Sequence, residues 1–241
     1  MTSYGMTVSR TRRVPPATLE ALRQLDTCRI ANAIEEFDLR LRNEGFTAPG
    51  LWCFFPELPP VVGYAVTAQI RCSSPPPRGH SYPDRTDWWE MMRSFPEPRI
   101  AVIQDLDREP GLGSFVGEVH ARILRALGCT AVITNGSVRD LESVREARFQ
   151  MFASGASISH AYAHMIDFGR PVEIRGLRIA PGDLLCGDRH GVISIPLEIA
   201  AELPAVAARQ AQKESRVIDL CDSPAFSVDR LRAEIELGEI R

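Results

Sequence analysis

Residues 99–134 form the most regular part of the sequence, and they constrain the fold class most strongly. A short apolar run at Arg99–Gln104 and a β-branched run at Thr130–Thr134 predict two buried strands. Between them Glu118–Leu127 has helical periodicity, and Gly128 stands where glycine is favoured after a helix. A strand–helix–strand order of this kind indicates an α/β protein.

The flanking segments add further helices, strands and hairpins. Val61–Arg71 predicts a strand and Leu141–Ala147 the start of a helix. Val172–Ile179 predicts a hairpin that turns at Arg175-Gly176, and a long helical segment follows from about Leu197 to Val217. Because hairpins follow the alternation of strands and helices, we expect a layered α/β domain with a mixed sheet rather than a doubly wound parallel sheet.

The 241 residues are expected to form one domain, 1–241, that carries insertions. Residues 1–14 are predicted to be flexible, and 197–241 to be a C-terminal helical segment. Residues 47–60 and 73–98 are insertions rich in proline and aromatic side chains. The pair Trp88-Trp89 fits an ordered cover over a site and a peripheral packing patch equally well.

Charge and cysteine content exclude several classes of protein. The net charge of −3 and the lack of a Lys/Arg cluster argue against a nucleic-acid partner. No apolar stretch approaches the roughly 20 residues of a membrane span, and the N-terminus lacks a signal-peptide core, so we expect a cytoplasmic protein with no membrane partner. The six cysteines include no C-x-x-C pair, so neither a zinc ribbon nor a disulfide framework is expected, and Cys129 and Cys186 are predicted to be buried.

The glycine-rich loop Gly111–Gly117 leads into the helix that begins at Glu118. Free backbone N–H groups at a helix N-terminus bind anions, although a tight strand-to-helix turn without a ligand has the same composition. No Gly-Lys-Ser/Thr follows, so the loop is not a Walker motif, and its spacing differs from the dinucleotide fingerprint. The predicted apolar face of the helix consists of Val119, Ile123 and Leu127.

A second candidate segment, Ile133–Asp140, runs from an apolar strand through an Asn-Gly turn to Arg139 and Asp140. Charged residues just past a strand end lie where ligand sites of α/β sheets usually lie. Arginine binds carboxylates through two parallel hydrogen bonds, and aspartate suits Mg²⁺ or Mn²⁺, so the pair would suit an α-keto acid. The alternative is a surface Arg–Asp pair that caps the next helix.

Three further features admit two interpretations each. His160 and His164 are spaced for one helix face and could bind a metal, but their neighbours are typical of a strand. His190 is either a pocket residue or a loop residue with a structural hydrogen bond. Glu118 either points to a metal or only begins a helix, where a carboxylate favours the dipole.

Taken together, the segments Gly117-Glu118 and Asn135-Gly136-x-x-Arg139-Asp140 resemble the core of the RraA-like family. Three other segments resemble the family's first helix, first strand and closing turn: Asp26–Glu36, Gly63–Ala68 and Pro181–Val192. The likeness covers roughly residues 20–200. The family contains 4-hydroxy-4-methyl-2-oxoglutarate aldolases and regulators of ribonuclease E. The resemblance implies a layered β/β/α, swivelling-domain-like architecture around a mixed sheet.

The resemblance also implies roles for particular residues. Backbone amides of Gly117, Glu118, Val119 and His120 would face the pyruvyl group of an oxo acid. Arg139 would bind substrate oxygen as a catalytic residue, and Asp140 would be catalytic as the ligand of Mg²⁺ or Mn²⁺. Family members form ring-shaped homotrimers, sometimes paired into hexamers, in which a neighbouring subunit supplies an acidic residue.

The implied activity is a metal-dependent lyase that releases pyruvate, either as an aldolase or as an oxaloacetate decarboxylase. The alternative is a non-catalytic regulator that binds a protein partner. A methyltransferase is disfavoured, because no glycine-rich first loop is followed by an acidic residue after the next strand. Asn135 departs from the Asp-Gly that the family often has, which removes a carboxylate near the metal.

Overall fold

The computed structural model describes residues 13–78 and 84–238. The segments 1–12 and 79–83 lie outside this range, so the expectation of flexibility over 1–14 is largely untested. Val14, however, is buried, and its N–H donates to the hydroxyl of Tyr64 at 2.7 Å.

The described residues form seven helices and thirteen strands. The helices are α1 Pro16–Arg23, α2 Thr27–Glu35, α3 Arg85–Met92, α4 Glu118–Ala126, α5 Leu141–Glu146, α6 Leu203–Cys221 and α7 Val228–Gly238. The first strands are β1 Trp52–Cys53, β2 Val61–Arg71, β3 Arg99–Asp105, β4 Ser114–Val116, β5 Cys129–Thr134, β6 Ser137–Val138 and β7 Gln150–Ala153. The remaining strands are β8 Gly155–Ala156, β9 His164–Phe168, β10 Val172–Ile174, β11 Leu177–Ile179, β12 Leu184–Asp188 and β13 Gly191–Ile195.

An eight-stranded mixed sheet forms the centre of the molecule. Its order is β1-β7-β5-β3-β2-β12-β13, and β9 also pairs with β2. Strands β2, β3, β5 and β7 are parallel neighbours, whereas β1, β9, β12 and β13 pair antiparallel. The crossovers from β3 to β5 and from β5 to β7 pass through α4 and α5. The expected α/β fold with a mixed sheet is therefore confirmed.

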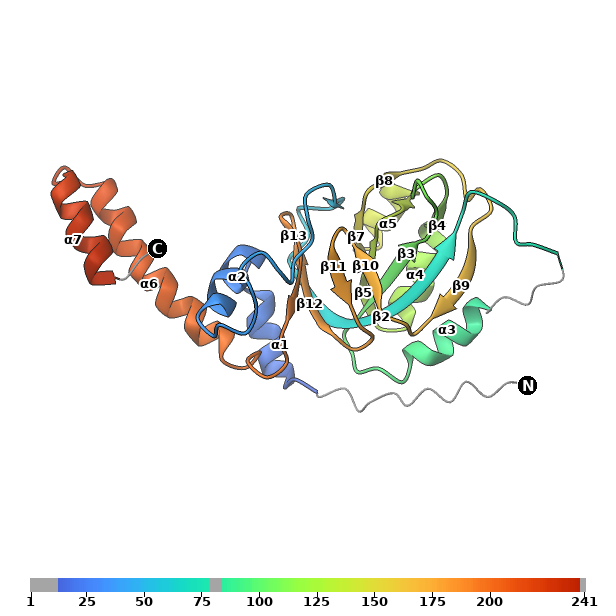
Figure 1. Cartoon of the computed structure of the whole chain (residues 1–241), viewed down its shortest axis with the longest axis horizontal. Coiled ribbons are helices and arrows are strands. Elements are labelled where there is room, and N and C mark those ends of the chain that lie inside the picture. The colour runs from blue at the N-terminus through green and yellow to red at the C-terminus, as the bar shows by residue number, and fades with distance from the viewer. Residues whose placement is uncertain (1–12, 79–83, 239–241) are drawn as a thin grey trace.

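The sheet is covered on both faces, which explains why its central strands are continuously apolar. On one face, Val66, Ala101 and Val132 pack with residues of α3 and α4. On the other face, Ala65, Val102 and Ile133 pack beneath the hairpin β10–β11. Figure 1 shows this hairpin in front of the sheet, with α4 and α5 behind it, so the layers are hairpin, sheet and helices.

Helices at one end of the sheet form a third apolar cluster. Buried residues of α1, α2 and the start of α6 pack against β12 and β13. Beyond this cluster α6 continues away from the body, and α7 folds back beside it (Figure 1). The predicted C-terminal helical segment is therefore two helices, with turns over 197–202 where the first helix was expected to start near Leu197.

Two details differ from the sequence-based expectations. The insertion 73–98 contains a helix, α3, whose Trp88 is fully buried. The buried residues of α4 are His120, Ala121 and Leu124; of the predicted face, Val119 is 73% exposed, whereas Leu127 packs against the core. The helix turns this way because α3 supplies aromatic partners for the His120 ring.

A small parallel sheet, β4-β6-β8, extends the ends of the central strands. Each of its strands follows one strand of the main sheet: β4 follows β3, β6 follows β5, and β8 follows β7. Because parallel strands end at the same edge, the starts of α4 and α5 lie together there. This small sheet determines the geometry of the candidate site.

Candidate functional site

The turns before α4 and α5 meet at the carboxyl edge of the small sheet. The N–H of Arg139 donates to the carbonyl of Val116 at 3.2 Å, which joins the ends of β4 and β6. The N–H of Glu118 donates to Oδ2 of Asp140 at 3.0 Å. The two segments singled out in the sequence are therefore in direct contact.

Gly117 is required by this contact. A Cβ atom at position 117 would lie 2.4 Å from Oδ2 of Asp140 and 2.9 Å from Nε of Arg139. Its backbone is extended, with φ −124°, so the requirement is close approach and not left-handed geometry. The glycine therefore lets both charged side chains lie against the start of α4.

Asp140 has a left-handed backbone, with φ 55° and ψ 43°, which is uncommon outside glycine. Its side chain makes no capping hydrogen bond to α5, the helix that it precedes. It accepts instead from the first amide of α4, where the helix dipole favours a carboxylate. The interpretation of a surface pair that caps the next helix, α5, was therefore wrong, because the carboxylate accepts a hydrogen bond from the first amide of α4.

Arg139 has an unsatisfied donor at the site. Its Nε is buried and has no hydrogen-bond partner among the described residues. The nearest carboxylate oxygen, Oδ2 of Asp140, is 3.5 Å away, and the Arg139 side chain is 28% exposed. A buried donor without a partner is costly, so a ligand oxygen at this position would be stabilised.

Asn135 holds the ends of two strands together. Its Oδ1 accepts from the N–H of Asp105 at 2.7 Å, and its Nδ2 donates to the Asp105 carbonyl at 2.9 Å. A carboxylate at this position could not make the second hydrogen bond. The departure from Asp-Gly therefore gives position 135 a structural role in joining β3 to β5.

The predicted substrate-binding residues of α4 differ in how they are presented. The carboxylate of Glu118 pairs with Arg122 at 2.9 Å, so this side chain is engaged within the helix. The amides of Val119 and His120 lie in the first helical turn, where backbone N–H groups have no intrahelical acceptor. The start of α4 therefore offers backbone donors to an anion, with Asp140 already bound to the first of them.

The His120 side chain is held by the protein on both sides. Its Nδ1 lies 3.1 Å from the carbonyl of Phe115, and Nε1 of Trp89 donates to its Nε2 at 3.4 Å. Burial lowers the pKa of His120 to about 4, and nearby Arg85 acts in the same direction. The ring is therefore neutral near pH 7 and is unavailable to a ligand.

Helix α3 braces the start of α4 through aromatic contacts. The rings of Trp88 and Trp89 lie edge-on to His120, with centroids 6.2 and 5.7 Å away. Phe115, the residue two before Gly117, contacts the same ring at 4.9 Å and carries Arg85 over its face at 4.8 Å. The tryptophan pair is thus an ordered packing element beside the candidate site.

Asp140 is the side chain at the site with the right chemistry for a divalent cation. Magnesium usually keeps several waters and takes one or two carboxylates from the protein, so a single aspartate fits the ion. A separate group, Cys72, Asp105 and Asp107, has potential metal-ligand atoms within 4.8 Å of one another. Its carboxylates accept backbone N–H groups of Cys72, Ser73, Asp107 and Gly111, so this buried group has a structural explanation.

The other histidines lie outside the candidate site. His160 is in a turn, with Nδ1 3.2 Å from the Ser114 carbonyl, and His164 is in β9. Neither belongs to the Cys72 group, which is the three-ligand group found among the described residues. His190 contacts Asp188, whose carboxylate also caps α2 at Thr27, so the structural interpretation of His190 is confirmed.

The predicted burial of two cysteines is confirmed. All six thiols are free, and Cys129 and Cys186 are buried as predicted. Burial raises the pKa of Cys129 to about 12. None of the described helices has the length and apolar character needed to cross a bilayer.

Comparisons with known proteins identify the family of this chain. A model of the RraA-like family, described as Aldolase/RraA, matches residues 27–194. A Halalkalibacterium halodurans protein named "Putative 4-hydroxy-4-methyl-2-oxoglutarate aldolase" is 27% identical over 125 residues, which span 51% of this chain and only 58% of that protein.

Two solved structures share the fold. An uncharacterized protein from Pseudomonas syringae pv. tomato has a TM-score of 0.72 at 21% identity and covers 92% of this chain and 96% of its own. Streptomyces coelicolor RraAS2, described as an unusual member of the RNase ES inhibitor RraA protein family, has a TM-score of 0.65 at 20% identity, covering 85% of this chain and 98% of its own. At these identities the likeness shows the fold alone.

Proposed function

Because the chain belongs to the RraA-like (Aldolase/RraA) family, we propose that it is a divalent-metal-dependent lyase that breaks a C–C bond of an oxo acid and releases pyruvate. One observation carries the proposal: the buried Nε of Arg139 makes no hydrogen bond to the described residues and lies 3.5 Å from the Asp140 carboxylate at the start of α4. The substrates that we infer are 4-hydroxy-4-methyl-2-oxoglutarate and oxaloacetate, because cleavage of either leaves pyruvate enolate.

Arg139 and the start of α4 would stabilise the charge that forms during cleavage. When the C–C bond breaks, its electron pair moves into the enolate and negative charge grows on the C2 oxygen. Preset donors aimed at such an oxygen are among the strongest contributions to catalysis. In this proposal the guanidinium of Arg139 and the first-turn amides of Val119 and His120 would be these donors.

Asp140 would hold the metal ion. A bound Mg²⁺ or Mn²⁺ would act as a Lewis acid toward the C2 carbonyl. The side chain of Asp140 is 38% exposed, so solvent and substrate can reach it. The left-handed backbone at this position turns the carboxylate toward Gly117 and away from its own helix, which leaves it beside the substrate-binding donors.

We further propose that the active form is a homotrimer or hexamer in the cytoplasm, without a nucleic-acid or membrane partner. A site built from partly exposed Arg139 and Asp140 on one subunit leaves room for a neighbouring subunit to cover it. That neighbour would supply the acidic residue that the family resemblance implies.

The test is release of pyruvate from oxaloacetate and from 4-hydroxy-4-methyl-2-oxoglutarate, with Mg²⁺ and then with EDTA. The informative variant is Asp140→Asn, because asparagine tolerates the left-handed backbone and still accepts the Glu118 N–H. We expect metal-dependent release, and a loss of at least about a hundredfold in Asp140→Asn and Arg139→Ala.

A matched control is Arg145→Gln, which removes an exposed arginine in the last turn of α5 that pairs with Glu57. This variant should keep its activity. The family model, described as Aldolase/RraA, leaves a second candidate function, a regulator that binds a protein partner. Wild-type rates in folded Asp140→Asn, or no release by metal-loaded protein from either substrate, would reject the lyase and favour the regulator.

A further inference from the structure

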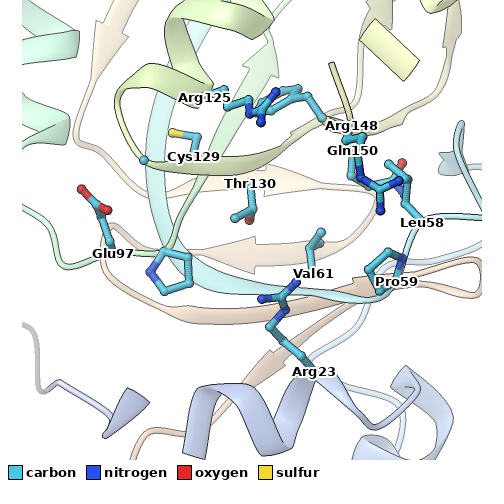
Figure 2. A pocket seen from close by; sticks show the side chains of 13 residues that line it. Arg23, Leu58, Pro59, Val61, Glu97, Arg125, Cys129, Thr130, Arg148 and Gln150 are labelled. Carbon is cyan, nitrogen blue, oxygen red and sulfur yellow. The ribbon is translucent and has the colours of Figure 1, made fainter. Parts of the chain in front are cut away.

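A separate pocket lies at the opposite edge of the central sheet from the candidate site. It is formed at the amino ends of β3, β5 and β7 and has a volume of about 560 Å³. Figure 2 shows the side chains around it, with Thr130 near the middle and Arg23, Arg125 and Arg148 at its margin. Cavities of this size accommodate small metabolites.

Three arginines from distant parts of the chain meet at this pocket. Arg23 comes from the last turn of α1, Arg125 from the last turn of α4, and Arg148 follows the end of α5. Arg23 and Arg148 are more than a hundred positions apart in the sequence, so only the tertiary fold places them at one pocket.

Arg23 pairs with Glu20 at 3.5 Å, whereas Arg125 and Arg148 have no ion pair among the described residues. The guanidinium of Arg148 has no hydrogen bond or ion pair within residues 13–78 and 84–238. Arg125 uses Nη1 to donate to the Ala147 carbonyl at 2.6 Å, which leaves its other donors available. The acidic residue of the pocket, Glu97, is already paired with Arg99 at 3.0 Å.

The backbone at Arg148 supports a role for its side chain. Its φ is 52°, in the left-handed region that glycine adopts most easily after a helix. Arginine at such a position costs about 1 kcal/mol or more relative to a conformation that suits it. The strained position thus carries a long cation whose head group has no protein partner.

We propose that this pocket binds a small organic anion through its carboxylate or phosphate groups. The arginines would bind the charged groups, because guanidinium pairs with either group through parallel hydrogen bonds. Leu58, Pro59 and Phe149 line the same pocket and would contact an apolar part of the molecule. The proposal does not depend on the proposed lyase activity.

The pocket and the candidate site lie at opposite ends of the same two helices. Helix α4 begins beside Gly117 and ends at Arg125, and α5 begins beside Asp140 and ends near Arg148. A nine-residue helix is about 13 Å long, so one small molecule in the pocket would not reach Arg139. The occupant would therefore bind at a site separate from Arg139, where Arg125 joins the carboxyl ends of the two helices through the Ala147 carbonyl.

Calorimetric titration of the full chain with citrate and with pyrophosphate tests the proposal. Citrate stands for carboxylate ligands and pyrophosphate for phosphate ligands. We expect one-to-one binding of at least one of them with a Kd below about 1 mM. Arg148→Gln should weaken it about tenfold or more, because charged hydrogen bonds are lost without loss of any protein contact.

Two control variants separate this pocket from other positive charges. Arg145→Gln removes the same charge nearby outside the pocket, and Arg139→Ala disables the candidate site; both should bind the probe as the wild type does. Absence of binding by either probe, or equal affinity in the wild type and Arg148→Gln, would overturn the proposal. Loss of binding in Arg139→Ala would do the same, by assigning the anion to the other site.

Discussion

The amino ends and the carboxyl ends of α4 and α5 carry charged side chains in very different arrangements. At their amino ends Arg139 and Asp140 are neighbours in sequence, and the backbone of Gly117 lies against both. At their carboxyl ends Arg125 and Arg148 line an open pocket with few protein partners. The first arrangement is tightly fitted and suits a defined reaction geometry, whereas the second leaves its charges free for a ligand.

The largest effect on activity should come from a methyl group added at Gly117, where α4 begins beside Arg139 and Asp140. In Gly117→Ala the new Cβ would meet Oδ2 of Asp140 at 2.4 Å, so the carboxylate or the turn must move. A displacement of about 1 Å at a catalytic group can cost about a hundredfold in rate. We expect a loss of that order in pyruvate release, and overpacking of about 1–3 kcal/mol in denaturant unfolding.

This variant also tests whether the amino and carboxyl ends of α4 and α5 act independently. Gly117→Ala should retain anion binding at the pocket lined by Arg125 and Arg148, because these residues are remote from the added methyl group. Unchanged pyruvate release in Gly117→Ala would show that the position of Asp140 does not matter for activity. Loss of both properties, with the protein folded, would instead show that the two ends respond as one unit.

The next effect concerns the pH dependence of stability through His120. Its pKa is about 4 in the folded protein because of burial, against about 6.5 for an unperturbed histidine. The unfolded chain therefore binds more protons between these values, and stability that is present above pH 6.5 is lost as the pH falls toward 4. The contribution is on the order of 3 kcal/mol, since each pKa unit corresponds to about 1.4 kcal/mol.

Unfolding by urea at pH 7.5 and pH 5 measures this loss. His120→Gln is the matched variant, because glutamine can donate to the Phe115 carbonyl and accept from Trp89 without titrating. The difference in unfolding free energy between wild type and variant should shrink as the pH falls. A difference that stays constant over this range would mean that burial does not hold the ring neutral.

A smaller effect is expected from Asn135→Asp, which restores the residue that the family often has. The carboxylate could still accept the Asp105 N–H but would face the Asp105 carbonyl, where Asn135 now donates at 2.9 Å. Loss of this hydrogen bond should lower the free energy of unfolding by about 1–3 kcal/mol. Equal or greater stability would show that the strand ends adjust to a carboxylate.

The sequence predicted the candidate site at the amino ends of α4 and α5 better than the pocket at their carboxyl ends. Gly117, Arg139 and Asp140 lie in short segments whose turn chemistry is local, so the meeting of two crossovers could be inferred from one strand–helix–strand unit. Arg23, Arg125 and Arg148 share no local pattern, and only the tertiary fold makes them neighbours. This explains why a chain without a basic cluster in its sequence has one in its structure.

Local patterns also failed where aromatic packing overrode hydrophobic periodicity. Val119 was expected inside because it is apolar, but the imidazole of His120 takes that direction, since Trp89 and Phe115 satisfy and enclose it. Helix α3 was missed because its apolar residues do not lie on one stripe and prolines flank it. A buried histidine with both nitrogens bonded could be found only from coordinates.

The smallest effect should follow Arg122→Gln, which removes the partner of the Glu118 carboxylate. The pair is exposed and spaced by one helical turn, so its loss should cost about 0.3–0.5 kcal/mol in denaturant unfolding. Pyruvate release should remain within about twofold, since one exposed pair of this energy changes an equilibrium little and Glu118 acts through its N–H. A large change in rate or in metal dependence would instead mean that the freed Glu118 carboxylate reaches the ion. Position 118 would then belong to the metal site together with Asp140.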